Sequence, residues 1–402
     1  MGNSFEAVKI TDDVYWVGAI DWAIRDFHGY HTGRGSTYNA YLILADKVTL
    51  MDTVKSPFFE EMMGRIRSVI DPAKIDYLIS NHSEMDHSGS IRQTIATIQP
   101  EQVFASPMGA KALVEHFHLS QEITPVKDGE TLSLGNRTLT FLETRMLHWP
   151  DSMVSYLAEE QLLFSQDGFG MHLATSERFA DEIPSDILEF EGAKYYANIL
   201  LPYSALVLKL AKRIEELGLR FSIIAPDHGP IWRKNPEKII GLYVRWAEQK
   251  PGNRAVVAFD SMWGSTELMA RSVADGLAGE GTKTKVLNLR ASHRSDLPTE
   301  VLGAGALLVG SPTLNNGIFP TLADNLCYLK GLKPQNLIGG AFGSYGWSGE
   351  SVKQLEALLK EMGVDVACDG LRIKYVPDQK ALAQSREWGA AVARQLKGRL
   401  GI

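Results

Sequence analysis

Residues 81–90 read Asn-His-Ser-Glu-Met-Asp-His-Ser-Gly-Ser and constrain the fold of this chain more than any other segment. Four of the side chains can ligate a metal ion: His82, Glu84, Asp86 and His87. The run before them, residues 75–80, is largely apolar and predicts a buried strand. The four ligand types therefore lie in a loop at the carboxyl end of a strand, with a helix predicted to begin at His87 and to continue through Gln93.

The spacing and chemistry of these side chains indicate a metal site. His82, Glu84 and Asp86 are two residues apart, so an extended segment projects them to one side. Carboxylate oxygens mixed with imidazole nitrogens suit iron, manganese or zinc, and the segment contains no thiolate. The alternative is a solvated polar loop, which would require this spacing after an apolar strand to arise by chance.

Composition limits the class of protein. A chain of 402 residues has room for two domains or more, and 45% hydrophobic with 22% charged residues is typical of globular proteins. The net charge of -7 argues against nucleic acid or an anionic membrane surface as the main partner. Neither Cys327 nor Cys368 belongs to a CxxC pair, which excludes a cysteine-based metal site and favours a reduced cytoplasm. We expect no signal peptide and no membrane span.

The first half of the chain predicts strands interspersed with helices, as in a layered α/β sandwich. The predicted strands are residues 14–17, 38–44, 47–52 and 102–106, and the predicted helices are 57–70 and 108–117. Three more strands, residues 138–144, 161–166 and 221–227, are followed by His148, Asp167 and His228. Seven ligand types are too many for one tetrahedral ion, so the set fits two metals with one carboxylate bridging them.

The second half predicts a doubly wound parallel sheet. Residues 247–253 have the composition of a linker, and strands then alternate with helices. We expect strands at 255–259, 285–289, 306–310, 337–342 and 371–375, and helices at 265–278, 319–329, 349–362 and from Gln379. Such a sheet binds its ligand at the carboxyl ends of the strands, where the strand order reverses.

Three loops are suited to that ligand. In residues 260–267, the hydroxyls of Ser261, Ser265 and Thr266 and the amides of a helix N-terminus can hold a phosphate without a lysine. The loop lacks the Gly-x-Gly-x-x-Gly and Gly-Lys-Ser/Thr patterns of dinucleotide and P-loop sites. Residues 311–317 and 343–349 offer glycines for close approach and flat side chains for packing on a ring.

The first half resembles the metallo-β-lactamase fold in its flavodiiron form, on the pattern His-x-Glu-x-Asp-His followed by the three later ligands. The resemblance implies an αββα sandwich over residues 1–250. It assigns one iron to His82, Glu84 and His148, the other to Asp86 and His228, and the bridge to Asp167. His87 belongs to the motif, although water can replace such a histidine. Asp227 could act as a supporting carboxylate.

The second half resembles flavodoxins, which implies an FMN-binding domain over residues 251–402. By this resemblance the phosphate is held by Ser261, Met262, Trp263, Gly264, Ser265 and Thr266. The flavin ring lies beside two further groups, Pro312, Thr313, Leu314, Asn315, Asn316 and Gly317 on one side, and Ser344, Tyr345, Gly346 and Trp347 on the other.

Both halves together resemble the flavodiiron proteins. That family implies reduction of O2 to water, or of NO to N2O, with electrons from a separate rubredoxin-type donor, in a head-to-tail homodimer. His28 could donate a hydrogen bond to the bound substrate, and Trp149 and the Tyr195–Tyr196 pair could wall the pocket. A satisfied loop histidine and ordinary core packing are the alternatives for these side chains.

Two other functions stay open at this point. One is a zinc hydrolase of the same fold with an accessory flavodoxin domain. Glu84 argues against it, because zinc hydrolases of the fold usually carry histidine there. The other is a plain electron carrier in which the metal half is only structural.

Overall fold

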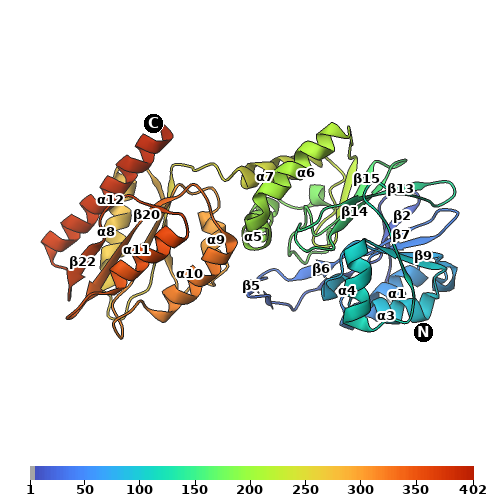
Figure 1. Cartoon of the computed structure of the whole chain (residues 1–402), viewed down its shortest axis with the longest axis horizontal. Coiled ribbons are helices and arrows are strands. Elements are labelled where there is room, and N and C mark those ends of the chain that lie inside the picture. Colours follow the sequence, from blue (N-terminus) through green and yellow to red (C-terminus); the bar gives the residue numbers. More distant parts are fainter. Residues whose placement is uncertain (1–4) are drawn as a thin grey trace. The chain divides into compact units, whose positions relative to one another are not determined.

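The computed structural model describes residues 5–402 and divides the chain into two compact units (Figure 1). Unit 1 comprises the described residues up to Phe27, together with Thr32–Tyr195 and Ala205–Val244. Unit 2 comprises His28–His31, Tyr196–Ser204 and Arg245–Ile402.

Two sheets form the middle of unit 1. The first has the order β1-β2-β7-β8-β9-β10-β11 and is parallel from β8 to β11; its strands are Val8–Lys9, Val14–Trp16, Tyr41–Ile43, Thr49–Met51, Tyr77–Ser80, Gln102–Ala105 and Ile123–Pro125. The second has the order β12 to β16, with Thr131–Ser133, Thr138–Glu143, Met153–Leu157, Leu162–Gln166 and Ile223–Pro226. Only its last pair, β15 and β16, is parallel. Shorter strands are β3 (Ala19–Asp21), β4 (Asp26–Phe27), β5 (Tyr30–His31) and β6 (Ser36–Tyr38).

The two sheets pack face to face through alternate residues of their strands. Phe141 of the second sheet lies in one buried cluster with Tyr41 and Ile79 of the first. The intervening strand residues, such as Leu42 and Leu78, point to the opposite face and pack under helices. This arrangement confirms the predicted αββα sandwich.

The helices of unit 1 cover the sheets (Figure 1). They are α1 (Phe59–Arg67), α2 (Met85–Ser88), α3 (Ile91–Ile98), α4 (Pro107–Phe117), α5 (Ser185–Tyr195), α6 (Ser204–Glu216) and α7 (Glu237–Glu248). Single turns add η1 (Ser56–Phe58), η2 (Pro72–Lys74) and η3 (Ala180–Glu182). The π-helix η4 (Tyr196–Leu200) and the turn η5 (Leu201–Tyr203) join α5 to α6.

Two predicted elements of unit 1 are wrong in detail. The helix expected from His87 to Gln93 is interrupted, because α2 ends at Ser88. Just after it, Gly89 lies against Ser56, and a Cβ atom on Gly89 would be only 2.9 Å from the backbone nitrogen of Ser56. The strand expected over 38–44 is two strands, β6 and β7. They part where the Asn39 side chain donates to the carbonyl oxygen of Pro226 at 2.6 Å.

Unit 2 contains one parallel sheet of order β18-β17-β19-β20-β21, with β22 also paired to β20. In chain order the strands are Arg254–Phe259, Lys283–Asn288, Ala306–Gly310, Ile338–Tyr345, Asp365–Val366 and Leu371–Lys374. The strand order reverses between β17 and β19, which is where such sheets bind their ligands.

Helices cover both faces of this sheet (Figure 1). On one face, Val257 and its neighbours pack against α8 (Ser265–Gly279) and α12 (Gln379–Leu400). On the other, Val256 and its neighbours pack against α9 (Asp296–Val301), α10 (Pro320–Leu332) and α11 (Ser351–Glu361). The doubly wound fold is confirmed, and α9 is a helix that the sequence analysis did not predict.

Unit 2 also includes two segments from the first half of the chain. The side-chain amide of Asn198 donates to the carbonyl oxygen of Ser295 at 3.1 Å and accepts from the hydroxyl of Tyr328 at 3.0 Å. The amide of His31 donates to the hydroxyl of Ser295 at 3.2 Å. Tertiary hydrogen bonds therefore join these residues to α9 and α10, although the chain places them far earlier.

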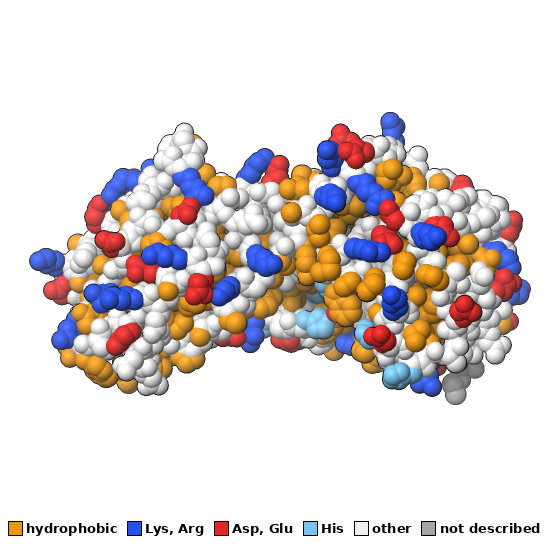
Figure 2. Space-filling model, viewed as in Figure 1, with side chains coloured by type: hydrophobic (Ala, Val, Ile, Leu, Met, Phe, Trp, Pro, Cys, Tyr) orange, Lys and Arg blue, Asp and Glu red, His pale blue; other side chains and the backbone are white. Residues whose placement is uncertain are grey.

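Across residues 5–402 the helices are too short or too polar to cross a membrane. On the face shown in Figure 2, lysine and arginine side chains are interspersed with aspartate and glutamate. No region of that face carries charge of a single sign over several neighbouring elements.

Candidate metal centre and flavin pocket

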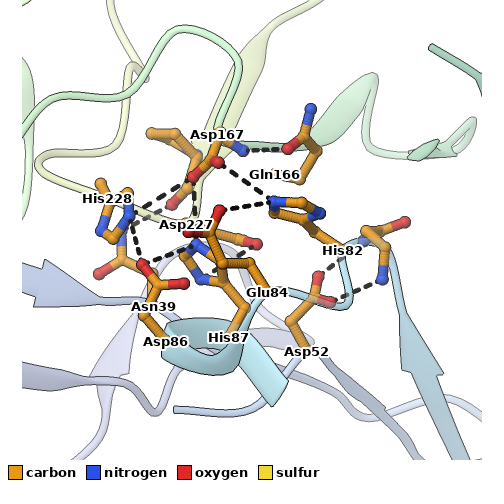
Figure 3. A network of polar contacts seen from close by, with 12 residues as sticks. Asn39, Asp52, His82, Glu84, Asp86, His87, Gln166, Asp167, Asp227 and His228 are labelled. Carbon is orange, nitrogen blue, oxygen red and sulfur yellow. Dashed lines mark hydrogen bonds and ion pairs between the residues drawn. The ribbon is translucent and has the colours of Figure 1, made fainter. Parts of the chain in front are cut away.

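Strand ends of unit 1 bring the seven predicted ligands together. Figure 3 labels each of them except His148. His82 and Glu84 follow β9, and Asp86 and His87 lie in α2. The other three, His148, Asp167 and His228, follow β13, β15 and β16. All but His148 are buried.

The ligand atoms form two groups, each with all atoms within 4.8 Å of one another. The first consists of His82, Glu84, His148 and Asp167. The second consists of Asp86, His87 and His228. Asp167 thus falls in the first group and His87 in the second, and the assignment of each group to an iron stays a prediction.

Asp167 faces both groups. Its Oδ2 atom lies 2.9 Å from Nε2 of His148 and 3.5 Å from Nε2 of His82. Its Oδ1 atom lies 3.1 Å from Nε2 of His87 and 3.4 Å from Nε2 of His228. In Figure 3 this carboxylate stands between His82 and His228. One carboxylate with its two oxygens turned to different ligand groups has the geometry of a bridge.

Neighbouring acceptors orient two of the imidazoles. Nδ1 of His82 lies 3.1 Å from Oδ2 of Asp151, and Nδ1 of His228 lies 2.6 Å from the carbonyl oxygen of Thr37. A carbonyl can only accept, so His228 carries its proton on Nδ1 and turns the lone pair of Nε2 toward the cluster. Asp151 likewise accepts a hydrogen bond from Nδ1 of His82, which leaves Nε2 of His82 facing the cluster. Hydrogen-bond partners of this kind orient histidine ligands in metal sites.

The donor set fits two iron ions. Four imidazoles and three carboxylates supply the nitrogen and hard oxygen ligands that iron prefers, and the carboxylates offset much of the charge of the metals. The Oδ1 atom of Asp86 is buried and, among residues 5–402, has no hydrogen-bond partner. Such an atom is costly to bury unless a cation or another partner satisfies it.

The electrostatics of the cluster point the same way. Burial alone would lower the pKa of His87, but Asp86 and Asp167 outweigh it and raise the pKa of His87 to about 10. Burial would raise the pKa of Asp167, yet the neighbouring imidazoles hold the pKa of Asp167 well below its usual range. The carboxylates therefore favour positive charge among the ligand nitrogens, which a metal ion would supply in place of a proton on His87.

A second layer of polar groups supports the metal loop. Asp52 accepts hydrogen bonds from the backbone amide of Asn81 at 2.6 Å and from its side chain at 2.8 Å. Burial raises the pKa of Asp52 to about 6. Burial and nearby Asp52 also raise the pKa of Asp227 well above its ordinary value, and Asp227 Oδ2 lies 3.6 Å from Nδ1 of His87.

Two of the predicted pocket residues, Trp149 and Tyr195, belong to unit 1. The ring of Trp149 lies 5.3 Å from that of His82 and 6.2 Å from that of His148, so it borders the first group. The Tyr195 ring lies 6.1 Å from that of His228.

The remaining two pocket residues belong to unit 2. The hydroxyl of Tyr196 is paired with Ser204 at 3.1 Å, and the Tyr196 ring lies 5.6 Å from that of Trp246. His28 has a positive φ of 57°. The proposed roles of His28 and Tyr196 stay predictions.

The predicted flavin loops of unit 2 line a cavity of about 580 Å³. Eleven predicted residues line it, namely Met262, Trp263, Ser265, Pro312, Thr313, Leu314, Asn315, Ser344, Tyr345, Gly346 and Trp347. Two of the other five have visible roles in the loops: Thr266 joins Ser344 by a 2.8 Å contact between hydroxyl oxygens, and Gly264, with a φ of 84°, precedes the first turn of α8. The Ser261 hydroxyl is buried and, in the described part of the chain, lacks a hydrogen-bond partner.

Sequence reasoning missed several residues of both sites. Asp151 and Thr37 orient ligands of the metal centre, but a lone acid in a turn and a backbone carbonyl carry no spacing signal. Tyr375 and Val376 line the flavin cavity just beyond β22. Their position at the carboxyl end of a parallel strand is the signal that could have identified them.

Two family descriptions match the chain. Residues 37–229 match the family described as "ODP family beta lactamase", and residues 257–389 match the family described as "Flavodoxin". The flavodoxin match begins within β17, ends within α12 and includes the three loops that line the cavity.

Similar proteins match nearly the full length of the chain. It is 49% identical to rubredoxin-oxygen oxidoreductase from Megalodesulfovibrio gigas over 98% of this chain and 99% of that protein. It is 45% identical to a nitric oxide reductase from Moorella thermoacetica over 97% of this chain and 99% of that protein. Among solved structures, the flavodiiron protein from Giardia intestinalis superimposes with a TM-score of 0.94 at 33% identity, covering 98% of this chain and 97% of that one.

Proposed function

Because this chain belongs to the flavodiiron protein family, we propose that it reduces O2 to water, NO to N2O, or both, at a pair of non-haem irons. It is an oxidoreductase that uses FMN and a diiron site. When bound, the two irons and FMN supply the electron-transfer chemistry, and the protein supplies binding, orientation and charge.

The position of Asp167 carries the assignment of the metal ligands. We propose that His82, Glu84 and His148 hold one iron and that Asp86 and His228 hold the other, with His87 beside them. Asp167, with one oxygen toward each group, would bridge the two. The ligand atoms form two groups rather than one, which supports two metals rather than a single ion.

The surrounding side chains hold the ligands in alignment. Asp151 and Thr37 hold the imidazoles of His82 and His228 in the orientation that a metal needs. The ring of Trp149 packs edge to face against the rings of His82 and His148 and borders the first ligand group.

The flavin part of the proposal assigns FMN to residues 251–402 and the irons to residues 1–250. The Ser261–Thr266 loop would hold the phosphate, and the other two loops would hold the ring. The unpaired hydroxyl of Ser261 and the N-terminus of α8 are suited to phosphate oxygens.

We further propose that the protein acts as a head-to-tail homodimer, in which the FMN of one subunit serves the irons of the other. Exposed apolar side chains support this arrangement. Met85 lies within the metal loop and is 55% exposed, while Trp263 and Trp347 at the flavin cavity are 89% and 87% exposed. A second copy that covers them would remove costly apolar surface from water. An active, monodisperse monomer in sedimentation would contradict the dimer.

The electron donor in this proposal is a separate rubredoxin-type protein, and the enzyme works in the cytoplasm. A similar protein is named for rubredoxin, which supports the donor. The two free cysteines suit a reducing compartment.

Metal and flavin content of the anaerobically purified protein tests the proposal. We expect two irons and one FMN per chain, together with consumption of O2 or NO when reduced rubredoxin is supplied. Zinc with FMN and turnover of a thioester or lactam would instead support the hydrolase. FMN without a transition metal would contradict the assignment of the metal loop.

A further inference from the structure

A buried carboxylate lies at the root of the proposed phosphate loop. Asp260 directly follows β17 and is 1% exposed. Its Oδ1 atom accepts a hydrogen bond from the backbone amide of Ser261 at 2.6 Å, and its Oδ2 atom accepts one from the hydroxyl of Thr321 at 2.6 Å. Asp260 thereby ties the loop to the first turn of α10.

This carboxylate creates an electrostatic problem for the site. A phosphate monoester carries close to two negative charges at neutral pH. The adjoining loop offers it hydroxyls and backbone amides but no lysine. Like charges that share a partly buried site repel more strongly than they would in water.

Arg290 is placed to offset that repulsion. It follows β18, the strand paired in parallel with β17, so both residues emerge at the same edge of the sheet. Its Nη2 atom lies 3.1 Å from Oδ1 of Asp260 and donates to the carbonyl oxygen of Ser261 at 3.1 Å. The guanidinium lies 5.7 Å from the centre of the Phe319 ring and is 57% exposed.

We propose that Arg290 is a positioning residue of the flavin site, which offsets the charge of Asp260 and so allows the neighbouring loop to hold a dianionic phosphate. The inference rests on the proposed function insofar as the ligand is FMN. It adds a residue from outside the three flavodoxin-like loops. It also explains why the loop needs no lysine, because Arg290, which follows the neighbouring strand β18, supplies the positive charge.

Flavin titration of the full-length protein, after removal of FMN, tests this inference. FMN and riboflavin differ only in the phosphate, so their dissociation constants separate phosphate effects from ring effects. We expect Arg290→Ala to raise the Kd for FMN about tenfold, equivalent to about 1.4 kcal/mol. The Kd for riboflavin should stay at the wild-type value. The difference in FMN affinity between Arg290→Ala and the wild type should become smaller as the salt concentration is raised, since salt screens exposed charges.

Three further variants complete the design. Arg290→Lys keeps the charge and should retain most of the FMN affinity. Asp260→Asn combined with Arg290→Ala removes both charges and should recover FMN affinity relative to Arg290→Ala alone. Arg394→Ala removes a similarly exposed arginine, 48% exposed and paired with Glu280, and should bind FMN as the wild type does.

The inference is overturned if Arg290→Ala binds FMN as tightly as the wild type, or loses affinity for FMN and riboflavin equally. It is also overturned if the double variant stays as weak as Arg290→Ala. Failure of the wild-type protein to bind FMN would contradict the proposed function itself and is seen before any variant is measured.

Discussion

The two sites of this molecule differ in how their side chains are held. Six of the seven residues of the metal centre are buried, and polar partners fix the imidazoles from behind. The flavin cavity has the opposite character, because Trp263, Trp347 and Tyr375 on its rim are more than half exposed. The metal centre is therefore preorganised by the core, whereas the flavin cavity depends on its ligand to cover apolar side chains.

This difference predicts how each site responds to change. A buried charged cluster is strongly coupled, so removal of one member leaves other charges uncompensated. An exposed aromatic rim contributes contacts that are nearly independent of one another, and each contact contributes little. Substitutions at the metal centre should thus have large effects, and those at the flavin rim should have small ones.

The largest expected effect is that of Asp167→Ala. Removal of the carboxylate that faces both groups should abolish binding of at least one iron and reduce turnover by about 100-fold or more, since even supporting residues of metal sites alter affinity by about 10–100-fold. FMN content should stay at one per chain. Analysis of iron and flavin content tests both expectations. The control is Asp181→Asn, at an aspartate that pairs with Arg233 away from the ligand groups. Full iron content and activity in Asp167→Ala would break the comparison.

Acidification should affect the metal centre next most strongly. Because Asp86 and Asp167 raise the pKa of His87 to about 10, a proton on His87 competes with iron at neutral pH. A rise in pH removes this competition, and each displaced proton should strengthen apparent affinity about tenfold per pH unit. Proton release during anaerobic iron titration in weak buffer measures the effect. Release of no protons near neutral pH would contradict it.

Asp151→Asn should have a smaller effect, because it leaves every ligand in place. The carboxylate of Asp151 accepts from Nδ1 of His82 and from the amide of Ser83 at 2.6 Å, and the amide side chain would lose the negative charge. We expect iron affinity to fall about tenfold, which is the lower end of the range of effects seen when a hydrogen-bond partner of a metal ligand is changed. Competition with a chelator measures this. Asp128→Asn, which removes an exposed partner of Arg213, is the control and should bind iron normally.

The smallest effect is expected at the flavin rim. Tyr375 lines the cavity and is 62% exposed, so Tyr375→Ala should weaken FMN binding only about fivefold, which corresponds to the loss of about 1 kcal/mol of aromatic contact. Tyr375→Phe should bind FMN almost normally, and Val286→Ala, at an exposed apolar position on β18, should change nothing. A loss as large as that of Asp167→Ala would show that the rim is as strongly coupled as the metal centre.

Much of this molecule could be predicted from local pattern. Most strands and helices of the second half were placed to within a few residues, because strands such as β17 and β19 are apolar runs bounded by turn residues. The seven ligand types were found because each follows such a run. Asp151 was missed for the converse reason, since a single aspartate in a turn resembles any other until the fold brings it to His82.

The limits of local pattern are clearest at the segments that belong to unit 2 while lying in the first half of the chain. Asn198 and His31 join unit 2 through hydrogen bonds to Ser295, a residue about 100 positions or more away. Local sequence carries no signal for such a partner. The loss of chain entropy when two distant segments meet is offset by the packing of the whole fold and not by the residues near the contact. The adjacent tyrosines show the same limit, since Tyr195 packs toward His228 while Tyr196 pairs with Ser204.

The sequence by itself determined the two architectures, the types of metal ligand and the three flavin loops, because periodicity and residue chemistry are local properties. The tertiary structure decided which predicted ligands share a group, which oxygen of Asp167 faces each group, and which cation approaches the loop after β17. These are relations between strand ends far apart in the chain. Sheet order and register set them, and a run of neighbouring residues does not record either.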